Sequence, residues 1–511
     1  MSDLHLPERI RRHAQDRPDR VAVIDGDAAL THAEFDALTS RIADALTRVA
    51  RPGDRVGGVL RMGLPGAALF VAAAKAGMVF TPLNWRLPAA EAAVIAVDAG
   101  LAFALVDDSD AGAAAALSAA LPDATVLRTD GEWDAFVASG AVRDPGFGAA
   151  ASAPLLQLYT SGTTGRPKGV VITHRNLYND AEALKVYAWQ DDSVALGAMP
   201  LFHIAGAGWL STCLSAAVPV VLLPTFDADA VPRLIEAHRI THAFLVPSTI
   251  RMLLDSPALD QHDVSSLQLV AYGSSPATAA LLTEAIARLN CGFLQRYGMT
   301  ETAGSVTALR TGDHDPSGPR SHLLRSAGTP MPGVELSIRD VVTGEPLGPG
   351  ETGEIVCRSR NNTERYWNRP DETAALFTTD GFLRTGDAGH LDDDGYLFVT
   401  DRIKDMIISG GENVYPIEVE SALAEHPAVA DVAVVGVPHP VWGEAVTAAV
   451  RLVTDAPAPT EPELIAFAGA RIASFKKPRR VVIVPDLPRG STGKVLKRQL
   501  RQELSVHEET A

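Results

Sequence analysis

Short apolar runs alternate with Ala- and Leu-rich amphipathic segments along much of this chain. One helical segment runs from Thr31 to Arg48, where Thr31 can cap the helix and Phe35 and Ile42 share an apolar face. Strands that alternate with helices in this way favour parallel sheets covered by helices. The sequence therefore predicts an α/β fold. The apolar runs are 55–60, 101–106, 124–127, 218–224, 242–247 and 267–273.

The pattern changes twice towards the C-terminus. From about residue 325 to 400, Gly and Pro punctuate short strand-like segments, which is typical of a small β module. After Asp401, helices and strands of a compact α+β domain are expected, with helices at 416–431, 461–475 and 495–504. We therefore expect an N-terminal region of residues 1–400 and a C-terminal domain of residues 401–511.

Residues 194–226 contain no Asp, Glu, Lys or Arg, and this run is long enough to span a bilayer. It also contains Pro200, Pro219 and Pro224 and has no closely flanking basic cluster, which favours a buried helix with adjoining strands. The N-terminus lacks the apolar stretch of a signal peptide. We therefore expect no integral membrane segment.

Charge and cysteine content exclude further classes of protein. Lys and Arg number 45 against 62 Asp and Glu, and the net charge of −17 argues against a nucleic-acid binder. A small anionic ligand is still compatible, because local cations and backbone N–H groups can bind it. Cys213, Cys291 and Cys357 lie too far apart in sequence for a disulfide framework or a CxxC zinc pair, which indicates a cytoplasmic location.

The loop from Tyr159 to Gly169 (YTSGTTGRPKG) is the strongest local signal. It lies between two apolar runs, and its glycines allow backbone N–H groups to converge on an anion. Lys168 adds a charge suited to a phosphate, although the Walker A spacing does not fit. We therefore predict a phosphate-binding loop of another type. Its hydroxyl donors are Thr160, Ser161, Thr163 and Thr164.

A second glycine pattern, GPGETG at 348–353, formally matches the dinucleotide-binding GxGxxG. Pro349 lies inside it, and a strand-like run follows where a helix would be needed. We interpret this pattern as a turn between strands, which excludes an NAD-dependent enzyme.

The 159–169 loop resembles the AMP-binding signature of the adenylate-forming superfamily, which includes acyl-CoA synthetases, adenylation domains of peptide synthetases and luciferases. Later motifs of the superfamily follow in order, so the resemblance covers essentially the whole chain. They are YGMTET at 297–302, TGD at 385–387, DRIKD at 401–405, SGGENVYP at 409–416 and PRGSTGK at 488–494. The resemblance implies two α/β layered subdomains and a small β-barrel in the N-terminal region, followed by a small, mobile α+β domain.

The resemblance also implies a role for each motif. Lys494 would stabilise the charge that develops as a carboxylate attacks the α-phosphate of ATP, and Lys404 would be the hinge of the mobile domain. Thr300 would donate to a phosphoryl oxygen, and Glu301 with Thr160 would hold Mg²⁺. The other residues expected at the nucleotide or the acceptor thiol are Ser161, Gly162, Thr163, Thr164, Gly165, Lys168, Gly273, Ser274, Tyr297, Asp387, Arg402, Gly410 and Gly411.

Three of these side chains also suit their roles by their own chemistry. Tyr297 can stack on a purine, Glu301 offers a hard oxygen ligand, and Asp387 can accept hydrogen bonds from ribose hydroxyls. Taken alone, they would be interpreted as a core aromatic, a helix N-terminal carboxylate and a turn aspartate. Their order and spacing favour the functional interpretation.

The resemblance places the acid substrate in an apolar pocket. His203 alone would be interpreted as a buried histidine, but the resemblance makes it an aromatic that gates the acceptor thiol. The GSSP sequence at 273–276 departs from the usual GGAP-like sequence, and its hydroxyls replace smaller groups. The pocket segments hold no Asp to bind an amine and no Lys or Arg, although Arg251 lies nearby, so an apolar aliphatic or aryl acid is favoured over a dicarboxylate. The expected lining residues are Phe202, His203, Trp209, Val246, Ser275 and Ala303.

We therefore expect an AMP-forming acid–thiol ligase that uses ATP, Mg²⁺ and coenzyme A. One alternative transfers the acyl group to a carrier-protein thiol or an amine. Another, of a different class, is a nucleotide-binding protein without catalysis, which the presence of both Glu301 and Lys494 disfavours. The expected partners are a small carboxylic acid, ATP and coenzyme A, with no nucleic acid, and a homodimer is left open.

Overall fold

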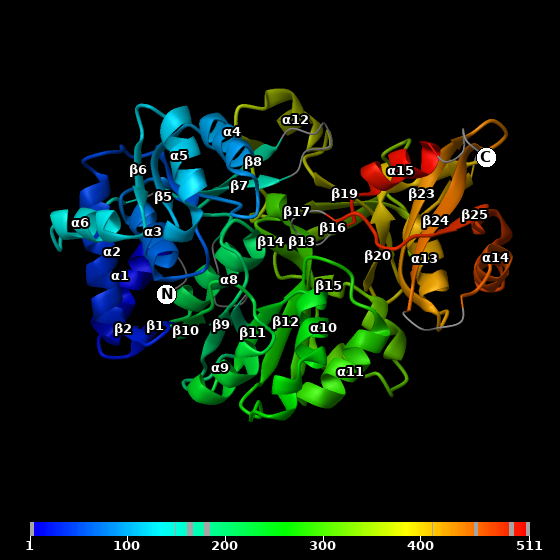
Figure 1. Cartoon of the computed structure of the whole chain (residues 1–511), viewed down its shortest axis with the longest axis horizontal. Coiled ribbons are helices and arrows are strands. Elements are labelled where there is room, and N and C mark those ends of the chain that lie inside the picture. Colours follow the sequence, from blue (N-terminus) through cyan, green and yellow to red (C-terminus); the bar gives the residue numbers. More distant parts are fainter. Residues whose placement is uncertain are drawn as a thin grey trace. The chain divides into compact units, whose positions relative to one another are not determined.

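Parallel strands form the centre of two large sheets, in agreement with the predicted α/β fold (Figure 1). The computed structural model describes residues 5–148, 150–160, 167–177, 184–410, 412–453, 458–489 and 495–506. The chain forms two compact units. The first contains residues 1–336 and 357–383, and the second contains residues 337–356 and 384–511.

The first unit contains a nine-stranded sheet in the order β15-β14-β13-β12-β11-β9-β10-β1-β2. Its central strands, from β13 to β1, pair in parallel. The strands are β1 (Val21–Asp25), β2 (Ala28–Thr31), β9 (Ala195–Gly197), β10 (Val220–Leu222), β11 (His242–Leu245), β12 (Leu269–Gly273), β13 (Gly292–Met299), β14 (Gly304–Leu309) and β15 (Thr329–Pro330). The helices between them are α8 (Ile204–Ser215), α9 (Ala230–His238), α10 (Pro247–Asp255) and α11 (Ala279–Leu289).

The same unit contains a seven-stranded sheet in the order β18-β8-β7-β4-β3-β5-β6. Its strands are β3 (Arg55–Val59), β4 (Val79–Leu83), β5 (Leu101–Val106), β6 (Thr125–Arg128), β7 (Pro154–Thr160), β8 (Lys168–Thr173) and β18 (Arg365–Tyr366). The helices of this part are α1 (Leu6–Asp16), α2 (His32–Leu46), α3 (Leu64–Lys75), α4 (Ala89–Ala99), α5 (Ala111–Ala120), α6 (Gly131–Ser139) and α12 (Pro370–Ala375). All six predicted apolar runs are therefore strands in these two sheets.

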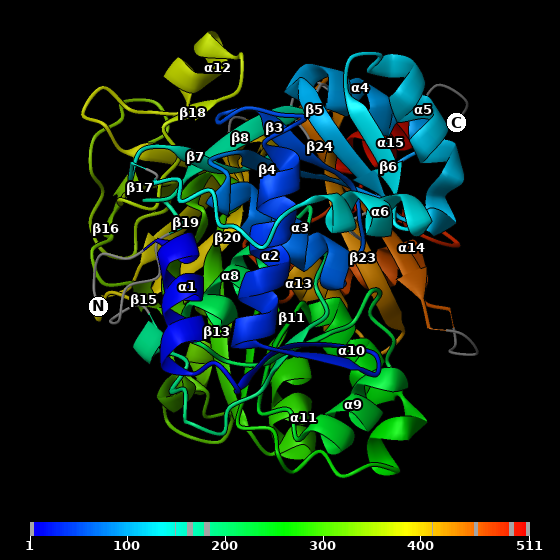
Figure 2. The same cartoon turned by 90° about the vertical axis from the view of Figure 1, so that its left-hand side faces the viewer.

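Helix α2 begins where the sequence predicts. The Thr31 hydroxyl accepts from the Glu34 N–H at 3.2 Å, and Glu34 Oε2 accepts from the Thr31 N–H at 2.8 Å. Such a capping box stabilises a helix start by about 1 kcal/mol. Phe35 and Ile42 of the predicted apolar face are buried, and α2 packs along α3 (Figure 2).

The charge-free segment 194–226 folds as the sequence predicts. It forms β9, the buried helix α8 and β10 in succession. Helix α8 has 12 residues, too few to cross a bilayer. Within the described residues, no helix has the length and apolar character of a membrane span.

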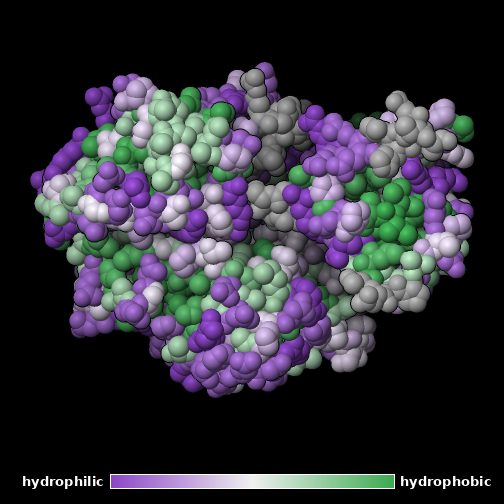
Figure 3. All heavy atoms as spheres, in the orientation of Figure 1, coloured by the Kyte–Doolittle hydropathy of each residue, from purple (hydrophilic) through white to green (hydrophobic). Residues whose placement is uncertain are grey.

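The Ala-rich helix α5 lies at the surface. Ala113, Ala114 and Leu117 are its buried residues, and they pack with α4 against the seven-stranded sheet. The remaining alanines give this part of the visible face the pale green of weakly hydrophobic residues (Figure 3). Alanine suits this position because it forms helix well without needing burial.

The second unit contains two smaller sheets. One has the order β16-β17-β19-β20, and the other has the order β22-β21-β24-β23 with β25 paired to β24. The strands are β16 (Glu335–Arg339), β17 (Gly353–Arg358), β19 (Leu383–Leu391), β20 (Leu397–Arg402), β21 (Ile407–Ser409), β22 (Glu412–Val414), β23 (Val429–His439), β24 (Gly443–Leu452) and β25 (Arg480–Ile483). The helices are α13 (Pro416–Ala424), α14 (Glu461–Gly469) and α15 (Lys497–Val506).

The β-rich module predicted for 325–400 is mainly the four-stranded sheet. Its outer strands, β16 and β20, do not pair with each other in the described residues, so the expected small barrel is an open sheet there. The GPGETG turn leads into β17, as predicted. Short 3₁₀ helices connect other elements. They are η1 (Asp108–Asp110), η2 (Pro257–Asp260), η3 (Thr300–Thr302), η4 (Thr311–Asp313), η5 (Ser321–Arg325), η6 (Ile403–Asp405) and η7 (Ser474–Lys476). The boundary of a mobile domain at residue 400 stays a prediction.

Two helices of the second unit are shorter than predicted. The helix predicted for 416–431 ends at Ala424, and β23 begins at Val429. Pro427 explains this, because proline disfavours helical backbone at the preceding residue. The helix predicted for 461–475 ends at Gly469, a residue with low helix propensity.

Two buried histidines of the first unit predict a pH-dependent stability. His32 and His174 each have a ring nitrogen without a hydrogen-bond partner among the described residues. Burial lowers the pKa of each from 6.5 to about 4. As the pH falls from 6.5 to 4, the unfolded chain takes up protons that the folded unit does not, so stability is lost. We expect a loss of up to about 3 kcal/mol for each histidine.

The measurement is the free energy of unfolding in urea between pH 7.5 and 4. Its slope against pH gives the number of protons that the unfolded chain binds in excess of the folded one. His174→Asn should lower that dependence by about one proton, because one titrating group is removed. His322 is exposed, and His322→Asn is the matched control. Equal pH dependence in the two variants would contradict the assignment.

Candidate active site

The predicted phosphate loop joins β7 to β8, which pair as an antiparallel hairpin. Thr160 and Lys168 lie directly opposite each other at the ends of these strands. Directly opposed residues of an antiparallel pair present their side chains on the same face. The hydroxyl and the ammonium therefore stand together where the loop starts and ends. Ser161, Gly162, Thr163, Thr164 and Gly165 lie outside the described residues.

A polar network that the sequence analysis missed supports this hairpin. The Tyr159 phenol donates to Asp98 Oδ2 at 2.7 Å, and Arg369 pairs with Asp98 Oδ1 at 2.6 Å. Gln157 Nε2 donates to the Tyr159 oxygen at 3.2 Å, and Gln157 Oε1 accepts from Arg55 Nε at 3.2 Å. Burial and the bond to Asp98 raise the pKa of Tyr159, so the phenol stays protonated. The network links β7 to α4 and to the segment after β18.

Several predicted residues follow the carboxyl ends of adjacent parallel strands. β9, β11, β12 and β13 are neighbours in the nine-stranded sheet, so these ends lie at one edge. Phe202 and His203 come after β9, Val246 directly follows β11, Gly273 ends β12, and Tyr297 lies near the end of β13. Parallel α/β sheets bind ligands at this edge. The sheet order thus gathers residues that are far apart in sequence.

The GSSP segment has a backbone that explains its first glycine. A Cβ on Gly273 would lie 2.2 Å from the Arg296 carbonyl oxygen, so only glycine fits beside β13. Ser274 has a φ of +67°, in the left-handed region that favours glycine. A serine here costs about 1 kcal/mol relative to an unstrained residue. The GSSP sequence therefore keeps the turn, but with a strained backbone at Ser274, where a second glycine would adopt the same φ without strain.

Thr300 and Glu301 form η3 directly after β13 and are 9% and 6% exposed. Glu301 Oε1 accepts a hydrogen bond from the Tyr366 phenol at 2.9 Å, and the Glu301 carbonyl oxygen accepts from the Thr363 N–H at 2.7 Å. The Lys168 ammonium lies 5.2 Å from the centre of the Tyr366 ring. The structure therefore brings the predicted metal ligand and the phosphate-loop lysine to the same tyrosine.

Neither Tyr366 nor Thr363 was identified from the sequence. Tyr366 stands in a two-residue strand, β18, that pairs with β8. No local motif predicts this pairing, because it joins segments about 200 residues apart in the chain. The local sequence offers only an aromatic pair at 366–367, ahead of Pro370.

His203 caps α8. Its Nδ1 accepts the Ala205 N–H at 3.0 Å, so the neutral ring carries its proton on Nε2. Trp209 is 3% exposed, and its indole N–H donates to the Leu196 carbonyl oxygen at 2.8 Å. Phe202 and Ala303 are also buried, whereas Ser275 is exposed. The pocket roles of these residues stay predictions.

Arg251 is engaged by two carboxylates. It donates to both oxygens of Glu284, at 2.6 and 3.0 Å, and to both oxygens of Asp255, at 2.7 and 3.0 Å. These bonds raise its pKa and occupy the whole donor fork of the guanidinium. This arginine is therefore committed to its own helix α10 and to α11.

In the second unit, Asp387 and Arg402 lie opposite each other on β19 and β20. Arg402 Nε lies 2.7 Å from Asp387 Oδ1, and the Asp387 side chain is 10% exposed. Gly386, just before Asp387, has a φ of +68°, which a glycine adopts without strain. The TGD motif thus presents a nearly buried carboxylate already paired with the predicted arginine.

The predicted hinge and acceptor residues are only partly described. Lys404 is exposed in η6, directly after β20. Gly410 forms the turn from β21 with a φ of +63°, and its N–H donates to the Trp442 carbonyl oxygen at 2.8 Å. Gly411 and Lys494 lie outside the described residues.

Comparison with protein families gives two matches. The AMP-binding enzyme family model matches residues 10–367. The model of the AMP-binding enzyme C-terminal domain matches residues 418–494. Together they include the phosphate loop, Glu301 and Lys494.

Individual relatives match over nearly the whole chain. A fatty acid–[acyl-carrier-protein] ligase, ScoC of Streptomyces coeruleorubidus, is 39% identical over 96% of this chain and 94% of its own. A feruloyl-CoA synthase of an Amycolatopsis species is 38% identical over 96% of this chain and 97% of its own. The ATP-bound structure of MatB from Rhodopseudomonas palustris aligns with a TM-score of 0.89 at 32% identity, covering 98% of this chain and 99% of MatB.

Proposed function

The chain belongs to the AMP-binding enzyme family of ATP-dependent, adenylate-forming ligases, and we propose that it joins an apolar carboxylic acid to the thiol of coenzyme A. ATP would first convert the acid to an acyl-adenylate with release of pyrophosphate. The thiol would then displace AMP. The observation that supports this most is the convergence of Lys168 and Glu301 on Tyr366, beside the predicted phosphate loop.

The nucleotide would be bound by several of the predicted residues. Thr160, Lys168 and Thr300 would bind its phosphates, and the adenine would stack on Tyr297 beside Gly273 and Ser274. Asp387, held by Arg402 at 2.7 Å, would accept hydrogen bonds from the ribose hydroxyls. Hydrogen bonds to a carboxylate that is already held in place lose less entropy.

The predicted metal ligands, Glu301 and Thr160, suit Mg²⁺ better than a metal ion held entirely by protein side chains. Glu301 is a single carboxylate, with Thr160 as the second expected ligand. No group of three or more His, Cys, Asp or Glu residues that could hold a metal occurs among the described residues. Mg²⁺ typically binds one or two carboxylates together with substrate phosphates and water. When bound, it would neutralise charge on the nucleotide phosphates.

In the first reaction, a carboxylate oxygen would attack the α-phosphorus, forming the acyl–phosphate bond as the bond to pyrophosphate breaks. Lys494 and the donors of the phosphate loop would stabilise the charge that develops on the phosphoryl oxygens. The chain's contribution is positioning and electrostatic, without a covalent enzyme intermediate.

In the second reaction, rotation at Lys404 would withdraw Lys494 and bring Gly410 and Gly411 to the thiol. The thiol would lose its proton to solvent, and its sulfur would form the thioester bond as the bond from the acyl carbon to the AMP oxygen breaks and AMP leaves. His203 would gate entry of the thiol, with Nδ1 held by its own helix at 3.0 Å.

The acid is expected to carry one carboxylate and an apolar body. Phe202, Trp209, Val246 and Ala303 would line its pocket, with Ser275 as a polar contact. Arg251 supports this choice, because Glu284 and Asp255 already occupy its donors at 2.6 and 2.7 Å. A second substrate carboxylate would have to compete with two intramolecular ones.

The test measures pyrophosphate release for fatty, aryl and dicarboxylic acids, each without a thiol, with coenzyme A, and with a pantetheinylated carrier protein. The carrier protein is included because one relative, at 39% identity, is named as a ligase to such a protein. We expect release with fatty or aryl acids and formation of an acyl-CoA.

Each outcome has a distinct meaning. Thioester formed only on the carrier protein would move the proposal to that acceptor. Pyrophosphate release without a thioester on either thiol would move it to another nucleophile, such as an amine. ATP binding with no pyrophosphate release for any acid would indicate a non-catalytic nucleotide-binding protein. Preference for dicarboxylates would contradict the assignment of Arg251.

A further inference from the structure

Tyr366 belongs to a segment that fastens the predicted metal ligand to the phosphate hairpin. Its backbone pairs with Val170 of β8. Just before it, Thr363 Oγ1 donates to the Val171 carbonyl oxygen at 2.5 Å, while the Thr363 N–H donates to the Glu301 carbonyl oxygen at 2.7 Å. Residues 363–366 are therefore held between η3 and the strand that begins with Lys168.

The side chain of Tyr366 contacts the Glu301 carboxylate directly. The phenol donates to Oε1 at 2.9 Å, and the two residues are 9% and 6% exposed. A hydrogen bond to an ionised carboxylate is stronger than one between neutral groups. Glu301 has several rotatable bonds, so this bond selects one orientation of a side chain that would otherwise sample others.

The same ring also contacts the phosphate-loop lysine. Lys168 Nζ lies 5.2 Å from the ring centre, within the range of a cation–π interaction. Lys168 and Glu301 have opposite charges, and the ring contacts the cation through its face and the carboxylate through its hydroxyl. One side chain thus sets the position of both charges.

We propose that Tyr366 is a positioning residue that orients Glu301 for the Mg²⁺ of the bound nucleotide. This rests on the proposed function only in taking Glu301 as the metal ligand. Groups that orient a metal ligand typically change metal affinity by about 10- to 100-fold when they are removed. The hydroxyl, rather than the ring, carries the effect on the metal.

The experiment compares Tyr366→Phe with the wild-type chain and with Tyr272→Phe. The control loses a comparable buried hydrogen bond, because the Tyr272 phenol lies 2.9 Å from His314 Nε2. Mn²⁺ binding to the protein, with ATP present and without an acid, is measured as the loss of the electron paramagnetic resonance signal of free Mn²⁺ beyond the loss that the same ATP causes without protein. We expect Mn²⁺ affinity to fall at least about tenfold in Tyr366→Phe and to be unchanged in Tyr272→Phe.

A double variant separates orientation of Glu301 from a general structural effect. In a Glu301→Gln background, Tyr366→Phe should cause no further loss, because the oriented carboxylate is already absent. The phosphates of ATP still hold the ion there, so binding stays measurable. Wild-type affinity in Tyr366→Phe, or equal losses in both backgrounds, would overturn the proposal.

This result is independent of the acid and the acceptor. If no acid supports pyrophosphate release, the proposed reaction fails, while the Mn²⁺ measurement still decides the role of Tyr366. If wild-type protein shows no Mn²⁺ binding with ATP, Glu301 is not a metal ligand and the positioning role falls with it.

Discussion

Replacing Lys494 with alanine is expected to lower the rate of adenylate formation by about 100- to 1000-fold, the usual effect of removing one group that stabilises a developing charge. The same variant should convert a supplied acyl-adenylate to thioester at close to the wild-type rate, because the lysine would act only in the first reaction. Pyrophosphate release and acyl-CoA formation from synthetic adenylate measure the two halves separately.

The matched control is Arg498→Ala, which removes an exposed basic residue close to Lys494 in sequence. It should leave both half-reactions unchanged. If Lys494→Ala slows both halves equally, the lysine has a structural role or serves both reactions, and its assignment to the first reaction alone is wrong.

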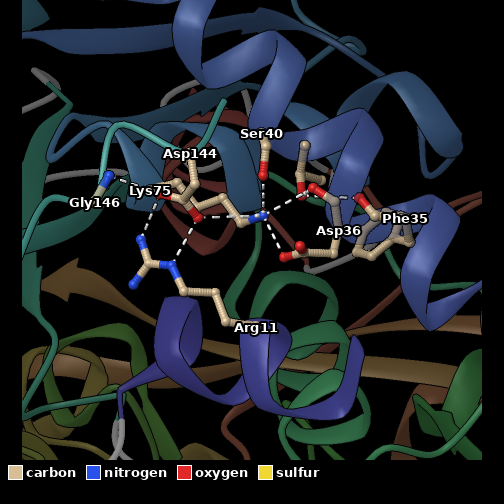
Figure 4. A network of polar contacts seen from close by, with 8 residues as sticks. Arg11, Phe35, Asp36, Ser40, Lys75, Asp144 and Gly146 are labelled. Atoms are coloured by element: carbon tan, nitrogen blue, oxygen red, sulfur yellow. Dashed lines mark hydrogen bonds and ion pairs between the residues drawn. The ribbon is translucent and has the colours of Figure 1, made fainter. Parts of the chain in front are cut away.

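Replacing Lys75 with methionine is expected to destabilise the first unit by about 3–5 kcal/mol. Lys75 has 0% exposure, and its ammonium donates to Asp36 Oδ1 at 2.6 Å and to the Ser40 hydroxyl at 2.8 Å (Figure 4). Asp144 Oδ2 lies 3.7 Å away and is also bound by Arg11 Nε at 2.6 Å. The network joins α1, α2, α3 and the segment after α6.

Methionine retains most of the stem of Lys75 but removes the charge, leaving a partly buried Asp36 without its cation. The measurement is the urea midpoint and the melting temperature. Arg12→Met is the control, because the exposed pair of Arg12 with Asp16, at 3.3 Å, should contribute no more than about 0.5 kcal/mol. A similar, small effect of both variants would show that the buried network contributes little.

Periodicity and capping made much of the fold predictable. The six apolar runs are strands, Thr31 caps α2, and the charge-free segment is a buried helix between strands. These signals are local, since each depends on residues within one or two turns or one strand. The helix predicted for 416–431 was wrong in its second half because Pro427 and the β-rich run after it outweighed the helical pattern.

The candidate site was predictable to a different degree. The residue types of the motifs follow from phosphate, metal and ribose chemistry, and the superfamily resemblance depends on them. Three features of the site were not predicted. They are the hydrogen bond from Tyr366 to Glu301, the hydrogen bond from Tyr159 to Asp98 with its neighbouring network, and the left-handed backbone of Ser274. Each depends on a pairing or a dihedral angle that has no local signature.

The residues of this chain establish its α/β character, its phosphate loop and the order of its chemical motifs, because spacing along one strand, helix or loop encodes them. The pairing of distant segments decides the rest. Strand order brings the ends of β9, β11, β12 and β13 to one edge, and the register of β18 on β8 sets Tyr366 beside Glu301 and Lys168. These contacts depend on strand order and register, which are set by the packing of whole sheets and not by any one local segment.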